Sequence, residues 1–232
     1  TYATLGALAV AFPLTIFALV APKLPASVVA ITQTLIPMMT YALALIVAIE
    51  RFRWTRVAGI GLGLAGVLLL VVPEASLPEP GMAGWVLVVL LTSLSLATAF
   101  IIAARFRPAD ADSVMMAAGT LSAGALFLLP VMAIEGSWWF LAAGLDTGAV
   151  ALLGQSVLYA VLWFLFLEII RLAGPVFFSA NNYLVPVAGV AWGMAIFGDR
   201  LSVWVWGALG LMIAGVVLLT VLGAGPRAKR PV

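Results

Sequence analysis

Eight apolar stretches of about 20 residues each follow one another along this chain, with only short connections between them. They lie at residues 3–22, 26–49, 56–73, 82–104, 113–134, 147–170, 176–198 and 203–223. A helix of about 20 mostly apolar residues is long enough to cross the hydrocarbon core of a bilayer. We therefore predict an all-α fold, a polytopic bundle of membrane helices with no connection long enough to hold a water-soluble domain.

The composition supports a membrane protein and argues against several kinds of active site. Apolar residues make up 65% of the chain and charged residues 9%, whereas a soluble domain has about 25% charged residues. The chain has no His and no Cys, which removes disulfides, thiol nucleophiles and the usual zinc ligands. The net charge of +2 is too small for a nucleic-acid footprint. We expect no metal, no cofactor, no nucleic-acid partner and no enzymatic activity.

The positive charges are divided unevenly between the two ends of the predicted spans. If each span crosses once, nine of the 11 Lys and Arg residues fall on the side where the chain begins. The nine are Arg51, Arg53, Arg56, Arg105, Arg107, Arg171, Arg227, Lys229 and Arg230; the other two are Lys23 and Arg200. Connections rich in Lys and Arg stay in the cytoplasm. We expect a multi-pass protein of the cell inner (plasma) membrane with both chain ends cytoplasmic.

An internal repeat relates two segments that are 149 residues apart. Leu35–Leu70 aligns without a gap to Leu184–Leu219, and eleven positions are identical. The matched pairs include Pro37 with Pro186, Arg51 with Arg200, Gly61 with Gly210, and the acidic Glu50 with Asp199. Shared apolar composition alone does not place proline, an acid–Arg pair and glycine in the same order, so we interpret the segments as two copies of one unit.

The two copies are expected to cross the membrane in opposite directions. Five predicted crossings separate them, and an odd number of crossings turns the second copy upside down. Inverted repeats that rock around a midplane site are typical of transporters that work by alternating access. The prolines near residues 78–81 mark the division between the halves, because proline does not continue a helix. We predict one unit at residues 1–73 and a second at residues 78–225.

The second copy resembles the EamA-type transporters of the drug/metabolite transporter superfamily. The resemblance rests on residues 183–187 (YLVPV), 198–202 (GDRLS) and 207–216 (GALGLMIAGV), and on Pro37, Glu50–Arg51 and Gly61–Gly66 in the first copy. It implies two repeats of five helices, ten in all, and outward transport of small metabolites. By that pattern, eight helices are present here, and residues 1–73 correspond to the last three helices of the first repeat.

Three acidic residues are candidates for gating or proton coupling. An ionisable group is costly at the centre of a bilayer, and no predicted span has one there. Glu50 and Asp199 lie at span ends, where repeat symmetry puts them at opposite mouths; they either gate the protein or are ordinary helix-terminus charges. Glu168 is the proton-coupling candidate, and the alternative is a surface-type pair with Arg171, three residues further on.

Uncharged polar residues indicate where a substrate binds. Gln155, Tyr159 and Trp163 recur every four residues and so share one helix face. Gln33 and its repeat counterpart Asn182 each come one turn before a proline. The predicted pocket residues are Gln33, Gln155, Tyr159, Trp163, Asn182 and Tyr183, with Pro37 and Pro186 as hinges. The alternative is that these side chains only form hydrogen bonds between helices.

These observations favour a membrane transporter. We expect an exporter of small neutral or zwitterionic, amino-acid-like metabolites that works by alternating access, with a small-molecule substrate and the lipid bilayer as its partners. The alternative is a non-transporting membrane scaffold or assembly protein, in which the polar residues only hold helices together. An enzyme is the least favoured reading, because no candidate nucleophile has a plausible base.

Overall fold

The computed structural model describes residues 1–48, 50, 52–72, 77, 81–106, 111–136, 147–178 and 181–222. Within helices, it leaves out the side chains of residues 104, 113, 163, 164, 166–178, 181–183, 221 and 222. The described residues form α1 (Tyr2–Leu5), η1 (Gly6–Ala11), α2 (Phe12–Val20), α3 (Ala26–Thr32), η2 (Gln33–Leu35), α4 (Ile36–Ile46), α5 (Trp54–Val71), α6 (Met82–Arg105), α7 (Ser113–Glu135), α8 (Thr147–Phe178), α9 (Asn181–Phe197), α10 (Val203–Val217) and η4 (Leu218–Leu222). The predicted all-α class is confirmed.

Several short elements join into continuous helices of membrane-spanning length. In the described part of the chain, six helices are long and apolar enough to cross a membrane: Tyr2–Val20, Ala26–Ile46, Trp54–Val71, Met82–Ala103, Val114–Glu135 and Val203–Thr220. Shorter apolar segments at Thr147–Leu162 and Leu184–Phe197 fall within the two remaining predicted spans. The structure is therefore a polytopic helix bundle, as the sequence predicts.

Two predicted boundaries are wrong. The sequence predicts a break between the spans 147–170 and 176–198, where Arg171 is followed by Gly174 and Pro175, but α8 continues to Phe178 and α9 begins at Asn181. A charged residue marks the limit of the lipid-facing segment and does not break the backbone hydrogen bonds of a helix. The helix continues through Gly174 and Pro175, both poor helix formers, so local helix propensity does not explain why α8 extends past the predicted end of the span.

The helix ends follow local sequence signals. The Asp112 carboxylate accepts a hydrogen bond from the Met115 N–H at the start of α7, and Ser202 caps α10 in the same way through Val205. Gly136 ends α7 and Gly198 follows α9, both with positive φ, a backbone conformation that glycine adopts at low cost. These caps fix where the connections begin.

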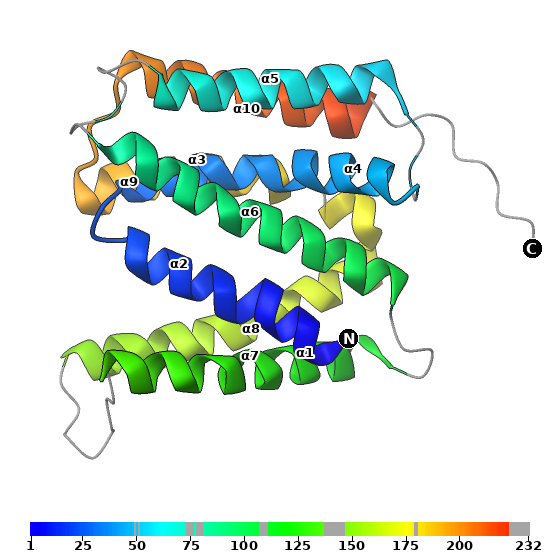
Figure 1. The fold of residues 1–232 in the computed structure, drawn as a ribbon, viewed down its shortest axis with the longest axis vertical. Helices are drawn as coiled ribbons and strands as arrows, with labels where there is room; N and C mark the ends of the chain where they lie inside the picture. The colour runs from blue at the N-terminus through cyan, green and yellow to red at the C-terminus, as the bar shows by residue number, and fades with distance from the viewer. Residues whose placement is uncertain are drawn as a thin grey trace, which may run out of the picture.

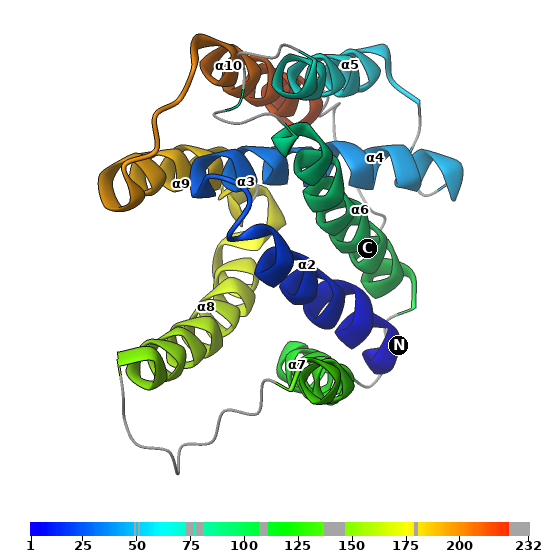
Figure 2. The ribbon, with the colours of Figure 1, turned by 60° about the vertical axis from the view of Figure 1, so that its left-hand side comes forward.

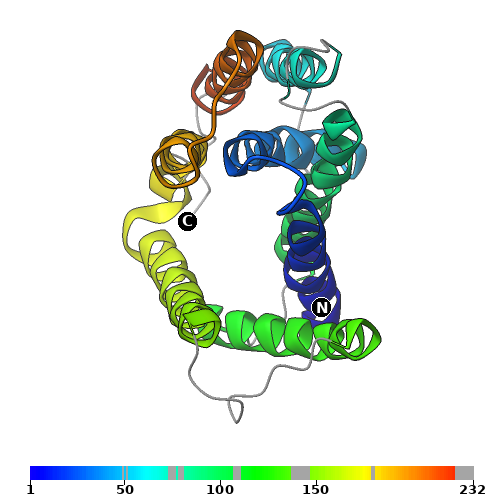
Figure 3. The same cartoon turned by 90° about the vertical axis from the view of Figure 1, so that its left-hand side faces the viewer.

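The helices lie in layers (Figure 1). The α5–α10 pair forms one outer layer, α3–α4 and α9 lie next to it, α2 and α6 follow, and α7 and α8 lie on the far side. Figures 2 and 3 show α8 running between α9 and the layer of α7. A core that includes Leu35, Met38, Leu70 and Met212 joins α4, α5 and α10, and a second, around Val20, joins α2, α3 and α6.

Helices α5 and α10 pack closely through glycines. A Cβ added to Gly59 would lie 2.6 Å from the Gly215 carbonyl oxygen, and a Cβ added to Gly66 would lie 3.0 Å from the Ala208 carbonyl oxygen. Adding 149 to residue 59 gives 208, and subtracting 149 from residue 215 gives 66. The second contact is thus the first with the two copies exchanged. Residue numbers increase along α5 as they decrease along α10, so the helices run antiparallel (Figure 1).

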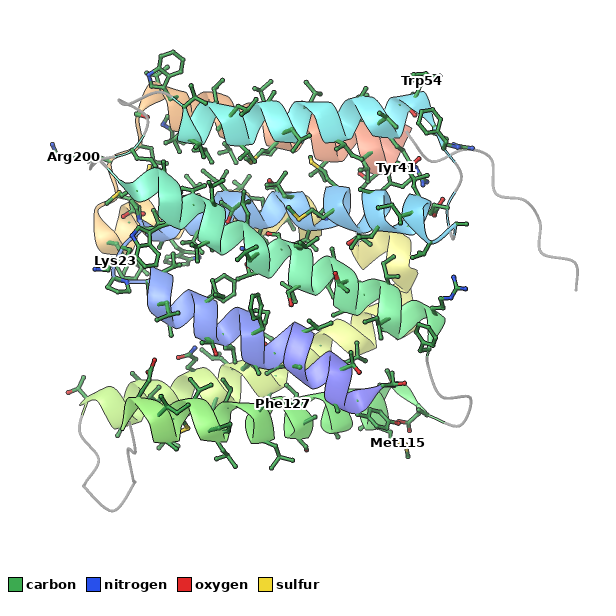
Figure 4. All side chains as sticks on the ribbon, viewed as in Figure 1. Lys23, Tyr41, Trp54, Met115, Phe127 and Arg200 are labelled. Atoms are coloured by element: carbon green, nitrogen blue, oxygen red, sulfur yellow. The ribbon has the colours of Figure 1, made fainter. Side chains whose placement is uncertain are left out.

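The charged ends of the bundle are separated in space. Lys23 and Arg200 lie at one end of the helices, and Trp54 lies at the other (Figure 4). The Arg105 guanidinium donates a hydrogen bond of 3.2 Å to the Val47 carbonyl, which brings the end of α6 to the end of α4. The described part of the chain therefore places Lys23 and Arg200 opposite the end that carries Arg53.

Candidate functional site

A group of amide and hydroxyl side chains joins α3 and α6 inside the bundle. The Gln33 amide nitrogen lies 3.3 Å from the Thr92 hydroxyl oxygen and 3.4 Å from the Thr32 hydroxyl oxygen. The Ser93 hydroxyl donates to the Thr32 carbonyl at 3.2 Å. Thr32, Thr92 and Ser93 are fully buried, and Gln33 is half-buried. Burial without partners would cost each of these groups free energy, so the cluster is a polar connection between the two helices.

The helix that carries Gln33 changes its hydrogen-bonding pattern where the proline requires it. Pro37 has no N–H to donate to the Gln33 carbonyl, as the residue four positions later does in an α-helix. The Ile36 N–H donates to that carbonyl instead, and Gln33–Leu35 form a short 3₁₀ turn. The predicted hinge at Pro37 therefore coincides with a local irregularity, directly beside the polar cluster.

A similar irregularity in backbone hydrogen bonding occurs in the first helix. Gly6–Ala11 form a π-helical segment just before Pro13. In a π-helix, the N–H of residue 13 would donate to the Leu8 carbonyl, five residues earlier. Residue 13 is a proline, so it has no N–H to donate. The Ser95 hydroxyl of α6 donates to the Leu8 carbonyl at 2.6 Å. Two proline-adjacent irregularities in the first unit thus face hydroxyl groups on one helix, α6.

The candidate gate residue Asp199 contacts the start of α3. Its Oδ2 atom accepts hydrogen bonds from the Ser27 N–H at 3.0 Å and from the Ser27 hydroxyl at 2.6 Å. Helices α3 and α9 approach closely here, because a Cβ added to Gly189 would overlap the Ala30 Cβ. A Cβ added to Gly193 would overlap the Ser27 hydroxyl oxygen. Glycine at both positions permits this approach.

The second candidate gate residue, Glu50, has a different partner. Its carboxylate, in the connection after α4, forms an ion pair at 2.9 Å with Arg56 in the first turn of α5. The Arg56 guanidinium carbon lies 4.9 Å from the centroid of the Tyr41 ring, and the Tyr41 hydroxyl accepts a hydrogen bond from the Arg53 N–H. At this end these contacts connect α4 to α5, whereas the Arg105–Val47 hydrogen bond connects the end of α4 to α6.

A cleft of about 460 Å³ opens beside Asp199. Its lining residues are Phe17, Ala21, Leu24, Pro25, Ala26, Val29, Phe197 and Asp199. The walls come from the end of α2, the start of α3 and the end of α9. Among these lining residues, Asp199 alone is ionisable. The cleft lies at the end of the bundle that carries Lys23 (Figure 4).

The predicted stripe on α8 is described only in part. Gln155 is exposed, and Tyr159 is half-buried. Trp163, Glu168, Asn182 and Tyr183 lie on α8 and α9, but their side chains are outside the described residues. Pro186 is buried inside α9. Helix α8 packs on α7 and α9, whereas Gln33 contacts α6, so these contacts do not link the exposed Gln155 to Gln33.

Sequence reasoning missed Ser27, Thr32 and Ser93. Each is a single small hydroxyl residue in an apolar span, and such residues commonly bond to their own helix backbone. Ser27 bonds to Asp199, 172 residues away, and Ser93 bonds to the Thr32 carbonyl, 61 residues away; no local spacing reveals either relation. The Thr32 hydroxyl itself donates to the Val29 carbonyl of its own helix. A usable signal was the position of Ser27 just after Pro25, at the start of a predicted span, where the first N–H groups of a helix need acceptors.

The fold is that of a polytopic membrane protein, and comparison with known proteins assigns the family. The model described as "EamA-like transporter family" matches residues 83–221, which is more than half of the chain. The chain therefore belongs to the EamA-like transporter family, within the drug/metabolite transporter superfamily. The family resemblance predicted from the sequence is confirmed.

Comparison with solved structures supports the same fold. The chain is similar to a crystal structure with a TM-score of 0.59 and 18% sequence identity, over 95% of this chain and 76% of that chain. At this identity, the likeness shows the fold alone. A comparison with curated protein sequences gives no match.

Proposed function

We propose that this protein exports small neutral or zwitterionic, amino-acid-like metabolites by alternating access. The observation that carries the proposal is the antiparallel packing of α5 on α10, in which the Gly59–Gly215 contact recurs as Gly66–Ala208 with the copies exchanged. Such a relation is what an in-plane pseudo-two-fold axis between inverted repeats produces. Two related halves of this kind exchange conformations and expose one site to each side in turn.

The proposed topology places both chain ends in the cytoplasm of a cell whose inner (plasma) membrane holds the protein. The opposite positions of Trp54 and Arg200 support it, since Arg53, Arg56 and Arg105 lie at the Trp54 end in the described part of the chain, and ends rich in positive charge stay in the cytoplasm. The units at residues 1–73 and 78–225 are then the two repeats. The family match at residues 83–221 falls within the second of them.

The proposed substrate pocket lies between the units. Gln33 supplies its half-buried amide, and Gln155, Tyr159, Trp163, Asn182 and Tyr183 supply the opposite wall from α8 and α9. Pro37 and Pro186 are the proposed hinges, and the 3₁₀ turn before Pro37 supports that role. Amide and hydroxyl groups with aromatic faces suit a solute that is polar and uncharged overall.

Gln33→Ala tests the pocket. We expect export of radiolabelled neutral amino acids from loaded proteoliposomes to fall at least about tenfold, because one well-placed polar contact contributes about 1.4 kcal/mol or more to binding. Stability in detergent should change by about 1 kcal/mol or less, since interhelical hydrogen bonds average about 0.6 kcal/mol. Thr98→Ala is the matched control, because this exposed hydroxyl of α6 bonds to the Leu94 carbonyl within its own helix.

The same experiment discriminates the scaffold alternative. A scaffold predicts that Gln33→Ala lowers stability and that wild-type proteoliposomes move no amino acid. For coupling, we propose a facilitator or an exchanger, with Glu168 as the candidate if protons are coupled. Amino-acid efflux that depends strictly on an imposed proton gradient, and that Glu168→Gln abolishes, would replace the facilitator with a proton-coupled mechanism.

A further inference from the structure

The hydrogen bonds between Ser27 and Asp199 join the two units of the chain at one mouth of the bundle. Ser27 is the second residue of α3, in the first unit, and Asp199 follows α9, in the second. The offset of 149 residues relates α4, which continues the helix that begins with α3, to α9, since Ile36–Ile46 corresponds to residues 185–195. We propose that Ser27 and Asp199 form a latch that closes this mouth, and that it opens once in each transport cycle. This inference rests on the proposed function.

The hydrogen bonds between Ser27 and Asp199 are of a strong kind, which suits a contact that keeps this mouth closed. The carboxylate accepts from both donors of Ser27, at 3.0 and 2.6 Å, and hydrogen bonds to an ionised acceptor are stronger than neutral ones. The Ser27 N–H belongs to the first turn of the 21-residue helix Ala26–Ile46, where N–H groups lack helical partners and the helix dipole favours a negative charge. Asp199 therefore caps a helix of the opposite unit.

The surroundings of Asp199 suit a contact whose hydrogen bonds can also break. Asp199 is half-buried and lines the cleft of about 460 Å³, so water can reach the carboxylate when the bonds break. A fully buried carboxylate that lost its partners would remain without solvation, at a cost of several kcal/mol. At the edge of the cleft this cost is smaller, because water replaces the donors of Ser27.

The glycines of α9 make the closed contact specific. Gly193 leaves room for the Ser27 side chain, and Gly189 leaves room for Ala30 one turn further in. The hydrogen bonds and the close backbone approach therefore form together. Separation of α3 from α9 would release both and expose Ala30.

The opposite mouth has a different arrangement. Glu50 corresponds to Asp199 by the repeat, but its ion pair with Arg56 stays inside the first unit. The residue that corresponds to Ser27 is Val176, which has no hydroxyl group to donate. The latch therefore acts at the mouth that carries Lys23 and Arg200.

Cysteine labelling measures the closure directly, because the chain contains no cysteine. Ala30→Cys serves as the reporter, labelled in intact cells and in inverted membrane vesicles with a membrane-impermeant maleimide. Adding Asp199→Ala should raise the labelling rate about tenfold from the side of Arg200, the effect of losing charge-assisted hydrogen bonds of ordinary strength. Ser27→Ala should give a smaller rise, because the backbone N–H remains.

Asp112→Ala is the matched control. Asp112 also accepts an N–H hydrogen bond at a helix start, at 2.7 Å from Met115, but that helix is its own. It should leave Ala30→Cys labelling unchanged. Unchanged labelling in both folded Asp199→Ala and Ser27→Ala would overturn the latch. Wild-type proteoliposomes that move no amino acid would overturn the proposed function, while the labelling rates would still report whether Ser27 and Asp199 hold the mouth closed.

Discussion

Helices α5 and α8 show two opposite ways in which an apolar helix is used in this bundle. α5 places Gly59 and Gly66 so close to α10 that an added Cβ would meet a backbone carbonyl oxygen, and it places Gly63 against the Met38 side chain of α4. On α8, the described side chains from Val150 to Leu158 are all exposed within this chain, including the polar Gln155. Two helices of similar hydropathy thus differ in whether small residues allow a backbone to approach, and overall hydrophobicity does not distinguish them.

The largest expected effect comes from filling the α5–α10 contact. Gly215→Leu should destabilise the protein by about 3 kcal/mol or more, because its Cβ would lie 2.6 Å from the Gly59 carbonyl oxygen and neither backbone can move aside. Thermal unfolding in detergent measures the loss. Gly210→Leu on the same helix is the control, since a Cβ there meets nothing within 4 Å. Equal losses for the two variants would contradict the packing described.

Truncation of one large side chain on each helix compares the packing of α5 with that of α8 without adding any atoms. Leu70→Ala should cost about 2–5 kcal/mol, because Leu70 is fully buried and its removal leaves a cavity. Leu158→Ala should change stability by less than about 0.5 kcal/mol, because this α8 side chain is 64% exposed. The unfolding midpoints of the two variants, measured in the same detergent, give the two losses of stability. Similar losses would show that α8 is packed as tightly as α5.

Gln155 separates a functional role on α8 from a packing role. Gln155→Ala should lower amino-acid efflux from proteoliposomes about tenfold if the side chain lines the pocket, while stability stays within about 1 kcal/mol. Ser156→Ala is its neighbour control, since the Ser156 hydroxyl bonds to the Leu152 carbonyl of its own helix. Normal efflux in Gln155→Ala would remove this residue from the proposed pocket.

The smallest expected effect is at the Glu50–Arg56 ion pair. Glu50→Gln should cost less than about 1 kcal/mol, because the carboxylate-bearing side chain is 47% exposed and exposed ion pairs contribute little. A double-mutant cycle with Arg56→Gln measures the interaction between the two residues. An interaction well above 1 kcal/mol would contradict the small contribution expected of this exposed ion pair.

The sequence predicted the helical spans well, because a bilayer imposes the same length on every crossing. The repeat offset was also visible in the sequence, from Pro37, Arg51 and Gly61 and their counterparts. The end of α8 was predicted wrongly at Ile170, since hydropathy reports where lipid contact ends and a helix can continue beyond it. The π-helical segment before Pro13 gave no recognisable signal.

The sequence predicted individual residues of the candidate site, but not which residues contact each other. The amide of Gln33 and the end position of Asp199 followed from polarity and span limits. The pairing of Gln33 with Thr92 and of Asp199 with Ser27 did not, because these contacts link residues 59 and 172 positions apart and depend on which helices pack together. Pairing of helices across the two units is a property of the folded bundle, and spacing along one helix does not contain it.

The central claim is that the two units cross the membrane in opposite directions. Single cysteines at Phe52 and Arg200, at corresponding ends of the two copies, test it in intact cells with a membrane-impermeant maleimide. The account predicts rapid labelling of Arg200→Cys from outside and labelling of Phe52→Cys only after the cells are permeabilised. Labelling of both cysteines in intact cells, or protection of both, would contradict it.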